Sequence, residues 1–394
     1  MPPSHFNTFE LLASAAQTWG DRAAVIDSQG TLSYNELLKR STHLAATLAE
    51  AKIERDSVLG ISINDARGFL TALFAILKHG GIALPLDPKL KPDELDRLAT
   101  DSGVAWIITP TGLERGRSPR SKSIQAEIPD AAVIRYTSGT TGISKGVIIS
   151  HQAINERTKV SGELLEVTAD DIVLSPLALS YHFIASALTF IRHGAIILDT
   201  FQLSPANTIA LAKSHAATAL YASPDICLAL ADQGQPLPSL RRAIATSANL
   251  SPGVASEFQI IFGLRLTQVF GIIEVGLPIW NDQSNLDPTV LGRCRAPYRY
   301  RIIDGTGTDV ACNQVGELML SGPGIFSGYV SGSEGTISKH RNEWFATGDL
   351  VRQDALGNIS FCGRKKSAIT LGGETIFPET IESVLREAEN IDLA

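Results

Sequence analysis

Hydrophobic positions along the chain predict helices and short strands in alternation. Residues 7–19 and 34–50 carry apolar side chains at helical spacing, and residues 66–80 form a largely apolar helix that ends at a glycine pair. The apolar runs at 57–63 and 82–88 are too short for helices and predict buried strands. Buried strands separated by helices predict a mostly parallel sheet with helices on both faces.

The same rhythm continues through most of the chain. Residues 23–27 and 30–34 alternate as in a β-hairpin, and residues 91–103 predict a helix that leads into a strand at 105–110. Residues 111–130 are polar and basic with little periodicity, which is typical of a surface loop. Strands are expected again at 132–139, 171–178, 194–199, 215–223, 240–248 and 264–271.

The pattern changes late in the chain. Short strands separated by glycine and aspartate turns dominate residues 291–362 and predict a small, distorted β-barrel packed on the α/β part. After Gly363, a basic stretch predicts a strand, a turn and a helix from about Pro378. We therefore expect a large N-terminal domain over 1–363, followed over 364–394 by a hinge and the shortened start of a small α+β C-terminal domain.

Composition narrows the class of protein. Of the 394 residues, 44% are hydrophobic and 19% are charged, as expected for a folded globular protein. The formal net charge of −7, without a long basic run, argues against nucleic-acid binding. The four cysteines are far apart and favour neither a zinc site nor disulfides, which fits the cytoplasm. No secretory signal is predicted, and no apolar stretch is long enough to span a bilayer.

Residues 136–146, "YTSGTTGISKG", concentrate glycines and hydroxyl side chains around one cation, Lys145. The stretch lies between two predicted strands, and Ser150 is placed to cap the helix that follows. Because glycines let backbone N–H groups turn toward a ligand, and hydroxyls and lysine add donors and charge, this loop can bind polyphosphate. It does not fit the Walker A pattern, and composition alone leaves a flexible hairpin open as the alternative.

The full string resembles the phosphate-loop signature of the ANL superfamily of adenylate-forming enzymes. This superfamily includes acyl- and aryl-CoA ligases, nonribosomal-peptide adenylation domains and luciferases; Ser144 stands where its members usually have proline. Other segments resemble its motifs in the family's order: "SPLALSYHFIAS" (175–186), "ATSANLSP" (245–252), "VFGIIEVG" (269–276), "FATGDLV" (345–351) and "GRKKSAITLGGETIFPETIE" (363–382). The resemblance covers nearly the whole chain.

The resemblance implies that this chain uses ATP to join a carboxylic acid to AMP and then passes the acyl group to a thiol. The residues that it assigns to the triphosphate are Thr137, Ser138, Gly139, Thr140, Thr141, Gly142 and Lys145. The residues that it assigns to the rest of the nucleotide are Ser247, Ala248, Asn249, Phe270, Gly271, Ile273, Asp349 and Arg364. Phe270 would stack on adenine, and Asp349 would accept hydrogen bonds from the ribose hydroxyls.

Catalysis is assigned to three residues, Lys145, Glu274 and His182. The resemblance gives Mg²⁺ to Glu274, and the residues around Glu274 agree, since a carboxylate in an otherwise apolar stretch needs a partner or a metal. Lys366 would lie at the pivot between the two domains. The acceptor thiol would belong to coenzyme A or to the phosphopantetheine arm of a carrier protein, and residues 370–374 resemble the strand that lines this arm's tunnel.

The expected walls of the acid pocket are Tyr181, His182, Phe183, Ala248, Gly271, Gly276 and Leu277. Amino-acid-activating members of the superfamily hold the α-ammonium group with an aspartate in this segment. Here His182 stands in that place, and no carboxylate lies in the surrounding stretch. Because a buried ammonium group without a counter-charge is costly, the sequence favours an acyl or aryl acid over an amino acid.

Two departures from the family pattern affect the expected activity. Ile273 stands where the family usually has threonine, and losing one transition-state donor costs roughly 3 kcal/mol, so we expect slow adenylation or a substitute donor nearby. The family's late catalytic lysine would lie beyond Ala394, and such a shortened chain is expected to bind ATP and acyl-AMP but to adenylate poorly. Two alternatives stay open: an amino-acid adenylation domain, and a degenerate protein that binds nucleotide or acyl-AMP without catalysis.

Overall fold

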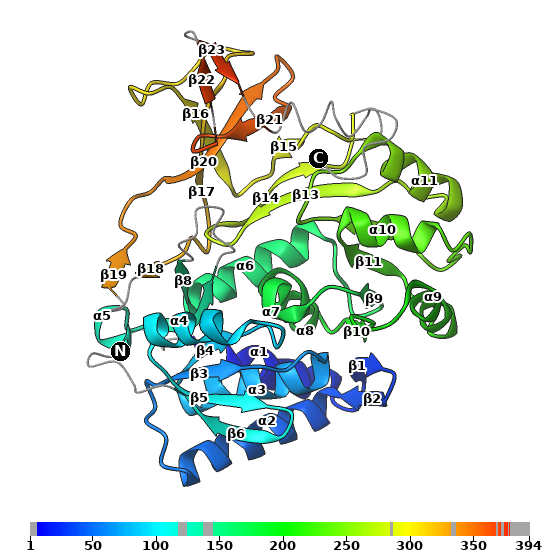
Figure 1. The fold of residues 1–394 in the computed structure, drawn as a ribbon. Coiled ribbons are helices and arrows are strands. Elements are labelled where there is room, and N and C mark those ends of the chain that lie inside the picture. The colour runs from blue at the N-terminus through cyan, green and yellow to red at the C-terminus, as the bar shows by residue number, and fades with distance from the viewer. Residues whose placement is uncertain are drawn as a thin grey trace.

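The computed structural model describes residues 6–116, 124–136, 145–283, 287–331 and 336–367, the backbone of 369–371 and 374–376, and Pro378. Within these residues, two sheets enclose a central layer of helices, and further helices cover the outer faces (Figure 1).

The first sheet has nine strands within the described residues. Their order is β15 (Arg293–Cys294), β14 (Gly276–Asn281), β13 (Thr267–Ile272), β12 (Arg242–Ala245), β11 (Ala219–Ala222), β9 (Ile172–Ser175), β10 (Ile196–Asp199), β1 (Ala23–Asp27) and β2 (Gly30–Ser33). The run from β13 to β1 is parallel throughout, whereas β2, β14 and β15 pair antiparallel at the two edges. This arrangement agrees with the predicted parallel sheet.

The second sheet is mixed and has eight strands within the described residues. Their order is β19 (Thr336–Lys339), β18 (Gly328–Ser331), β8 (Gly146–Ser150), β7 (Ala131–Tyr136), β4 (Ile82–Pro85), β3 (Val58–Ile61), β5 (Val104–Thr109) and β6 (Gly112–Arg115). Strands β7, β4, β3 and β5 are parallel neighbours. The strands from β7 to β19 are antiparallel, because β7 and β8 are joined by too few residues for a crossover.

Helices between the two sheets carry the main hydrophobic core. They are α1 (Phe9–Trp19), α3 (Ala66–His79), α6 (His151–Leu164), α7 (Leu179–His182), the π-helix η1 (Ile184–Leu188) and α8 (Thr189–His193). One cluster of buried side chains joins these helices to strands of both sheets. Phe69 of α3 and Phe183 after α7, both fully buried, lie within it with ring centres 5.5 Å apart. The core therefore fixes both sheets relative to each other.

The outer faces are covered by α4 (Pro92–Ser102), α5 (Ile124–Glu127), α9 (Pro205–Ser214), α10 (Pro224–Ala231) and α11 (Pro252–Phe262). Helix α2 (Tyr34–Glu50) packs on α1 and α3, and its buried side chains belong to the main core. Local sequence explains where several helices begin. Ser33 forms a capping box with Glu36, and Asp65 and Ser150 accept hydrogen bonds from backbone N–H groups in the first turns of α3 and α6. The predicted cap at Ser150 is thus confirmed.

The late strands form an open sheet instead of the predicted barrel. Within the described residues, β16 (Arg299–Ile303), β17 (Gly316–Ser321), β20 (Phe345–Gln353) and β21 (Ile359–Arg364) form a four-stranded antiparallel sheet. The barrel does not close because β18 and β19, which lie between β17 and β20 in the chain, extend the second sheet through β8. Strands β22 (Ile369–Leu371) and β23 (Glu374–Ile376) then pair antiparallel, and β22 agrees with the predicted strand.

The expectation of a loop over residues 111–130 is wrong in part. Residues 112–115 form β6, which pairs with β5 in an antiparallel hairpin, and residues 124–127 form α5. The turn at Pro110-Thr111 is short enough to fold this segment back on β5. Polar side chains hid the strand, because β6 lies at an exposed sheet edge where alternation with apolar residues is weak.

Candidate active site

A cavity of about 360 Å³ lies where the carboxyl ends of strands from both sheets meet. Side chains and backbone at the ends of β7, β11, β12 and β13 line it, together with parts of α6, α7, η1 and β14. Its residues are Arg135, Tyr136, Arg157, Ser161, Tyr181, His182, Ile184, Ala185, Tyr221, Thr246, Ser247, Gly271, Ile272, Ile273, Gly276 and Leu277. Ligands of parallel α/β sheets usually bind at this edge, so the position favours a binding site.

Most of the predicted acid-pocket residues line this cavity. Tyr181, His182, Gly271, Gly276 and Leu277 do so. The glycines let the β13–β14 hairpin close tightly: a Cβ on Gly271 would lie 2.6 Å from a methyl carbon of Leu277, and Gly276 has a φ of +123°. The cavity therefore has its wall where the motif "FGIIEVG" predicts one.

Two predicted pocket residues lie elsewhere. Phe183 is fully buried in the main core against Phe69 and does not line the cavity. Because it follows α7 by one residue, it turns away from the side on which Tyr181 and His182 face the cavity. Ala248 is exposed after β12 and is also absent from the lining, whereas its neighbour Ser247 lines the cavity in a left-handed conformation, with φ +77°.

His182 is held in its neutral form. Burial, with Arg135 nearby, lowers the pKa of the His182 imidazole to about 4. The ring is therefore uncharged at pH 7, and its nitrogens are available as one donor and one acceptor.

Arg135, which the sequence analysis did not single out, places a cation in the cavity. Its guanidinium carbon lies 5.8 Å from the centre of the Tyr181 ring. Its Nε atom is buried and has no hydrogen-bond partner among the described residues. Burial lowers the pKa of Arg135 to about 10, so the side chain stays charged at pH 7. No pattern in the sequence distinguishes this arginine from one at a strand edge.

Tyr329 joins two of the residues assigned to catalysis. Strand β18 pairs with β8 and sets Tyr329 opposite Val147. The Tyr329 hydroxyl donates a hydrogen bond to Glu274 Oε1 at 2.9 Å, and Lys145 Nζ lies 5.1 Å from the centre of the Tyr329 ring. Burial and then the Glu274 charge raise the pKa of Tyr329, which stays a neutral donor. Lys145 itself is exposed, and the rest of the predicted triphosphate loop, Thr137, Ser138, Gly139, Thr140, Thr141 and Gly142, lies outside the described residues.

Arg157 fixes the turn that carries Glu274. Its side chain is buried in α6 and donates to three backbone carbonyls: Nε to Gly324 at 2.5 Å, Nη1 to Ile273 at 2.6 Å and Nη2 to Glu274 at 2.8 Å. The Ile273 side chain is half-buried against the main core and offers no hydrogen-bond donor to the cavity. Arg157 was also missed by sequence reasoning, because its acceptors are backbone atoms far along the chain.

The predicted ribose residues come together through strand pairing. Asp349 on β20 is fully buried and stands opposite Arg364 on β21. Arg364 Nε lies 2.8 Å from Asp349 Oδ1. Phe270, assigned to adenine, is half-buried and packs against the core of the small antiparallel sheet, and Asn249 is exposed. The predicted pivot, Lys366, is exposed in the turn that follows β21.

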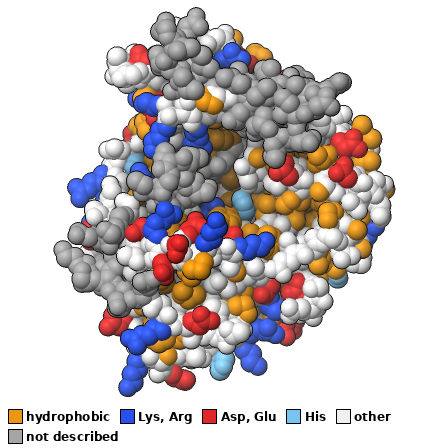
Figure 2. Space-filling view, viewed as in Figure 1, with side chains coloured by type: hydrophobic (Ala, Val, Ile, Leu, Met, Phe, Trp, Pro, Cys, Tyr) orange, Lys and Arg blue, Asp and Glu red, His pale blue; other side chains and the backbone are white. Residues whose placement is uncertain are grey.

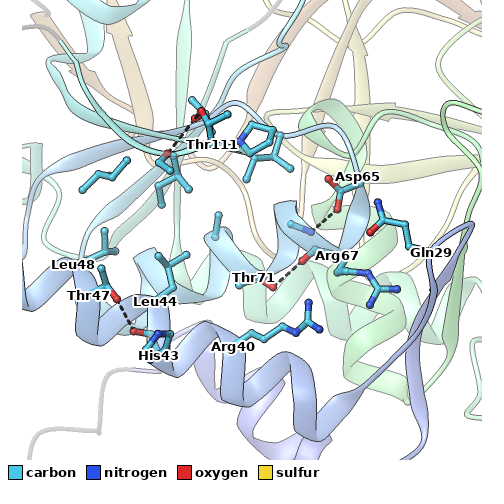
Figure 3. A pocket seen from close by; sticks show the side chains of 18 residues that line it. Gln29, Arg40, His43, Leu44, Thr47, Leu48, Asp65, Arg67, Thr71 and Thr111 are labelled. Atoms are coloured by element: carbon cyan, nitrogen blue, oxygen red, sulfur yellow. Dashed lines mark hydrogen bonds between the residues drawn. The ribbon is translucent and has the colours of Figure 1, made fainter.

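A larger cavity, of about 620 Å³, lies away from these residues (Figure 3). It is bounded by α2, α3 and the β5–β6 hairpin, with Arg40, His43 and Arg67 at its polar side. Arg67 is already paired there with Asp27 at 2.9 Å. No residue assigned from the motifs lines this cavity, so we place the candidate site in the smaller one.

The surface on one side of the molecule mixes charge and apolar side chains. On the face shown in Figure 2, charged side chains of both signs gather near the centre, and hydrophobic side chains lie to their right. None of the helices in the described ranges is long and apolar enough to cross a membrane.

Sequence comparison places this chain among known enzymes. The profile of the AMP-binding enzyme family matches residues 12–129 and 117–330. Bacitracin synthase 3 of Bacillus licheniformis is 26% identical over 422 residues, covering 100% of this chain. Malpibaldin synthetase of Mortierella alpina is 29% identical over 415 residues, covering 93% of this chain. The chain spans only 7% of the length of each of these relatives.

Solved structures share the fold. ATP-bound MatB from Rhodopseudomonas palustris superposes with a TM-score of 0.84 at 23% identity, covering 98% of this chain and 84% of that chain. The o-succinylbenzoate coenzyme A synthetase MenE from Bacillus subtilis, in complex with AMP, gives 0.85 at 22% identity, covering 97% and 84%. The α/β fold and the resemblance to adenylate-forming enzymes are thereby confirmed, and the chain belongs to the AMP-binding enzyme family.

Proposed function

We propose that this chain uses ATP to activate a carboxylic acid as an acyl-adenylate, which is then passed to a thiol. One observation carries the proposal: a cavity at the carboxyl edge of both sheets is lined by five of the seven predicted acid-pocket residues and by the turn that bears Glu274. An acid in this cavity would point its carboxylate toward the residues assigned to the phosphates.

The chemistry requires two anions to approach each other. A carboxylate oxygen attacks the α-phosphorus of ATP, the bond to the bridging oxygen breaks, and pyrophosphate leaves with the electron pair. Fixed positive charge and hydrogen-bond donors must offset the repulsion between the two anions. Lys145, the described cation of the predicted phosphate loop, would provide part of that charge. His182 is neutral at pH 7 and therefore adds no charge beside the acid.

Glu274 fits the part of a Mg²⁺ ligand. Mg²⁺ is commonly held by one or two carboxylates together with substrate phosphates, so a cluster of acidic side chains is not required. Among the described residues, no group of three His, Cys, Asp or Glu side chains could hold a metal. Glu274 Oε1 accepts the hydrogen bond from Tyr329, which orients the carboxylate. When bound, the ion would neutralise charge on the phosphates.

The ribose and the adenine would bind on the side of the small antiparallel sheet. Asp349 is a buried carboxylate whose oxygens can accept from two neighbouring hydroxyl groups, and it forms an ion pair with Arg364. Phe270 would provide an aromatic face for the adenine. Lys366, in the exposed turn after β21, would act as the pivot for a C-terminal domain.

An acyl or aryl acid fits the cavity better than an amino acid. The curated relatives include peptide synthetases, so an amino-acid substrate is the natural rival. Arg135, however, gives the cavity a positive charge, and none of the described residues that line it is acidic. An α-ammonium group there would face a like charge without a counter-ion, which is costly. The acceptor would be the thiol of coenzyme A or of a carrier-protein phosphopantetheine arm.

ATP–pyrophosphate exchange tests the proposal. Exchange should depend on an added carboxylic acid and on Mg²⁺, and a panel of the common amino acids should give much weaker exchange. An Asp349→Asn variant should raise the KM for ATP without changing the preference among acids. Exchange with one amino acid and with no simple acid would support the rival; nucleotide binding without exchange for any acid would support a protein that has lost catalysis.

A further inference from the structure

One cation in the proposed acid cavity has no partner within the described part of the chain. Arg135 lines the cavity, its Nε is buried, and none of its nitrogens forms an ion pair with a described residue. The carboxylates around it are engaged elsewhere: Glu274 accepts from Tyr329, and Asp87 Oδ2 accepts from the Tyr181 hydroxyl at 3.3 Å. The guanidinium is therefore available to a ligand in the cavity.

The second arginine in the same cavity shows what a structural arginine looks like here. Arg157 donates hydrogen bonds to three backbone carbonyls, and these bonds stabilise the fold. Arg135 has none of these bonds, although both side chains lose water on folding. Arg135 is half-buried, and its buried Nε has no hydrogen-bond partner among the described residues, so an anion in the cavity would give this donor the acceptor that it lacks.

The reacting carboxylate is a poor choice for this anion. Its charge passes to the pyrophosphate as the acyl–phosphate bond forms, so a cation held against it would stabilise the ground state more than the transition state and slow the reaction. The phosphates have another cation available, since Lys145 lies outside the cavity lining, on the Glu274 side. An anion that keeps its charge throughout the reaction uses Arg135 without this loss.

We propose, building on the acid activation proposed above, that Arg135 binds a second carboxylate of the substrate, so that the acid taken by this cavity is a small dicarboxylic acid. One carboxylate would lie toward Glu274 and react, and the other would pair with the guanidinium beside Tyr181. The apolar side chains of Ile184, Ala185 and Leu277 would contact the carbons between them. A cavity of about 360 Å³ limits this substrate to a small molecule.

Matched acids that differ only in charge test the proposal. Exchange is measured for a series of dicarboxylic acids and for the half-amide of each, which keeps the length and one reactive carboxylate. Wild-type protein should favour at least one dicarboxylate over its half-amide by about 10- to 100-fold in kcat/KM, the size of a charge-assisted hydrogen-bond pair. In Arg135→Gln this ratio should fall to near one, and in Arg135→Lys it should be partly kept.

A stability measurement separates this role from a structural one. Removing a half-buried cation whose Nε has no partner among the described residues should leave the Tm of the ligand-free protein unchanged or raise it. A lower Tm for Arg135→Gln would mean that the fold uses the arginine, and would overturn the proposal. If Arg135→Gln lowered kcat/KM equally for a dicarboxylate and for its half-amide, Arg135 would contact the nucleotide instead, and the proposal would be overturned. Exchange with acids that carry one carboxylate, without preference for a second carboxylate, would overturn this inference alone. The absence of exchange with any acid would overturn the proposed function.

Discussion

Replacing Arg157 by methionine should unfold the turn that carries Glu274. The side chain is 3% exposed, and its hydrogen bonds to the carbonyls of Gly324, Ile273 and Glu274 are 2.5, 2.6 and 2.8 Å long. Methionine fills a similar volume but leaves three carbonyls without their donors. Breaking such a buried charged network costs about 3–5 kcal/mol of the free energy of unfolding. The same change should abolish exchange, because Glu274 loses the backbone position that aims its carboxylate.

Urea unfolding followed by circular dichroism measures the stability, and exchange measures the activity. Arg157→Lys keeps the charge but lacks the planar fork of donors, so its loss should fall between methionine and wild type. Arg299→Met serves as a surface control, since the Arg299–Glu343 pair is mostly exposed and contributes little. A free energy of unfolding for Arg157→Met within about 1 kcal/mol of wild type would refute the reasoning, because the loss of three such hydrogen bonds should lower it by more.

Three further outcomes are expected. Ile273→Thr should raise kcat for exchange by up to about 100-fold by adding a hydroxyl donor to the cavity, and a variant no faster than wild type would contradict this. Tyr329→Phe should raise the Mg²⁺ concentration needed for half-maximal exchange by about tenfold, because Glu274 loses its orienting bond; an unchanged Mg²⁺ titration would count against it. Although burial opposes it, hydrogen bonds from Arg241, Thr168 and Thr218 lower the pKa of Asp171 to about 2, so its stabilisation is complete above pH 4 and is lost as the pH falls from 4 to 2. Asp171→Asn should therefore lower the free energy of unfolding by about 2 kcal/mol at pH 7. It should also make this free energy less dependent on pH between 4 and 2, and a pH dependence like that of wild type would contradict the prediction.

Local signals in the sequence were sufficient for α1, α2, α3, α4 and α6 and for most strands of the two large sheets. Caps such as Ser33 and Ser150, and the glycine at position 80, mark helix ends by interactions within a few residues, so they can be read from the sequence alone. The closure of the late strands could not be read in this way. Whether β18 completes a barrel or joins β8 depends on which distant edge is unpaired, and no local pattern records that.

The same limit explains which site residues were missed. Glu274 and Asp349 lie in recognisable strings, and the structure places them at the cavity turn and on β20. Tyr329 reaches Glu274 across 55 residues, and Arg157 reaches the Ile273 carbonyl across 116. Such contacts are set by strand register and helix packing, and the acceptors of Arg157 are backbone atoms that leave no trace in side-chain identity.

Two arginines therefore line one cavity, and they differ in the hydrogen bonds that each makes to the described part of the chain. Each of the three Arg157 nitrogens donates to a backbone carbonyl, so the side chain holds the fold and the carbonyl dipoles stabilise its charge. The buried Nε of Arg135 has no described acceptor. The positive potential of this side chain therefore acts on ligands in the cavity and raises their affinity when they are anions, compared with neutral or cationic ligands. Burial lowers the pKa of both side chains to about 10 and leaves both charged at pH 7. On this reasoning we expect Arg135, and not Arg157, to distinguish a dicarboxylate from its half-amide, because the hydrogen bonds of Arg157 are directed at backbone carbonyls.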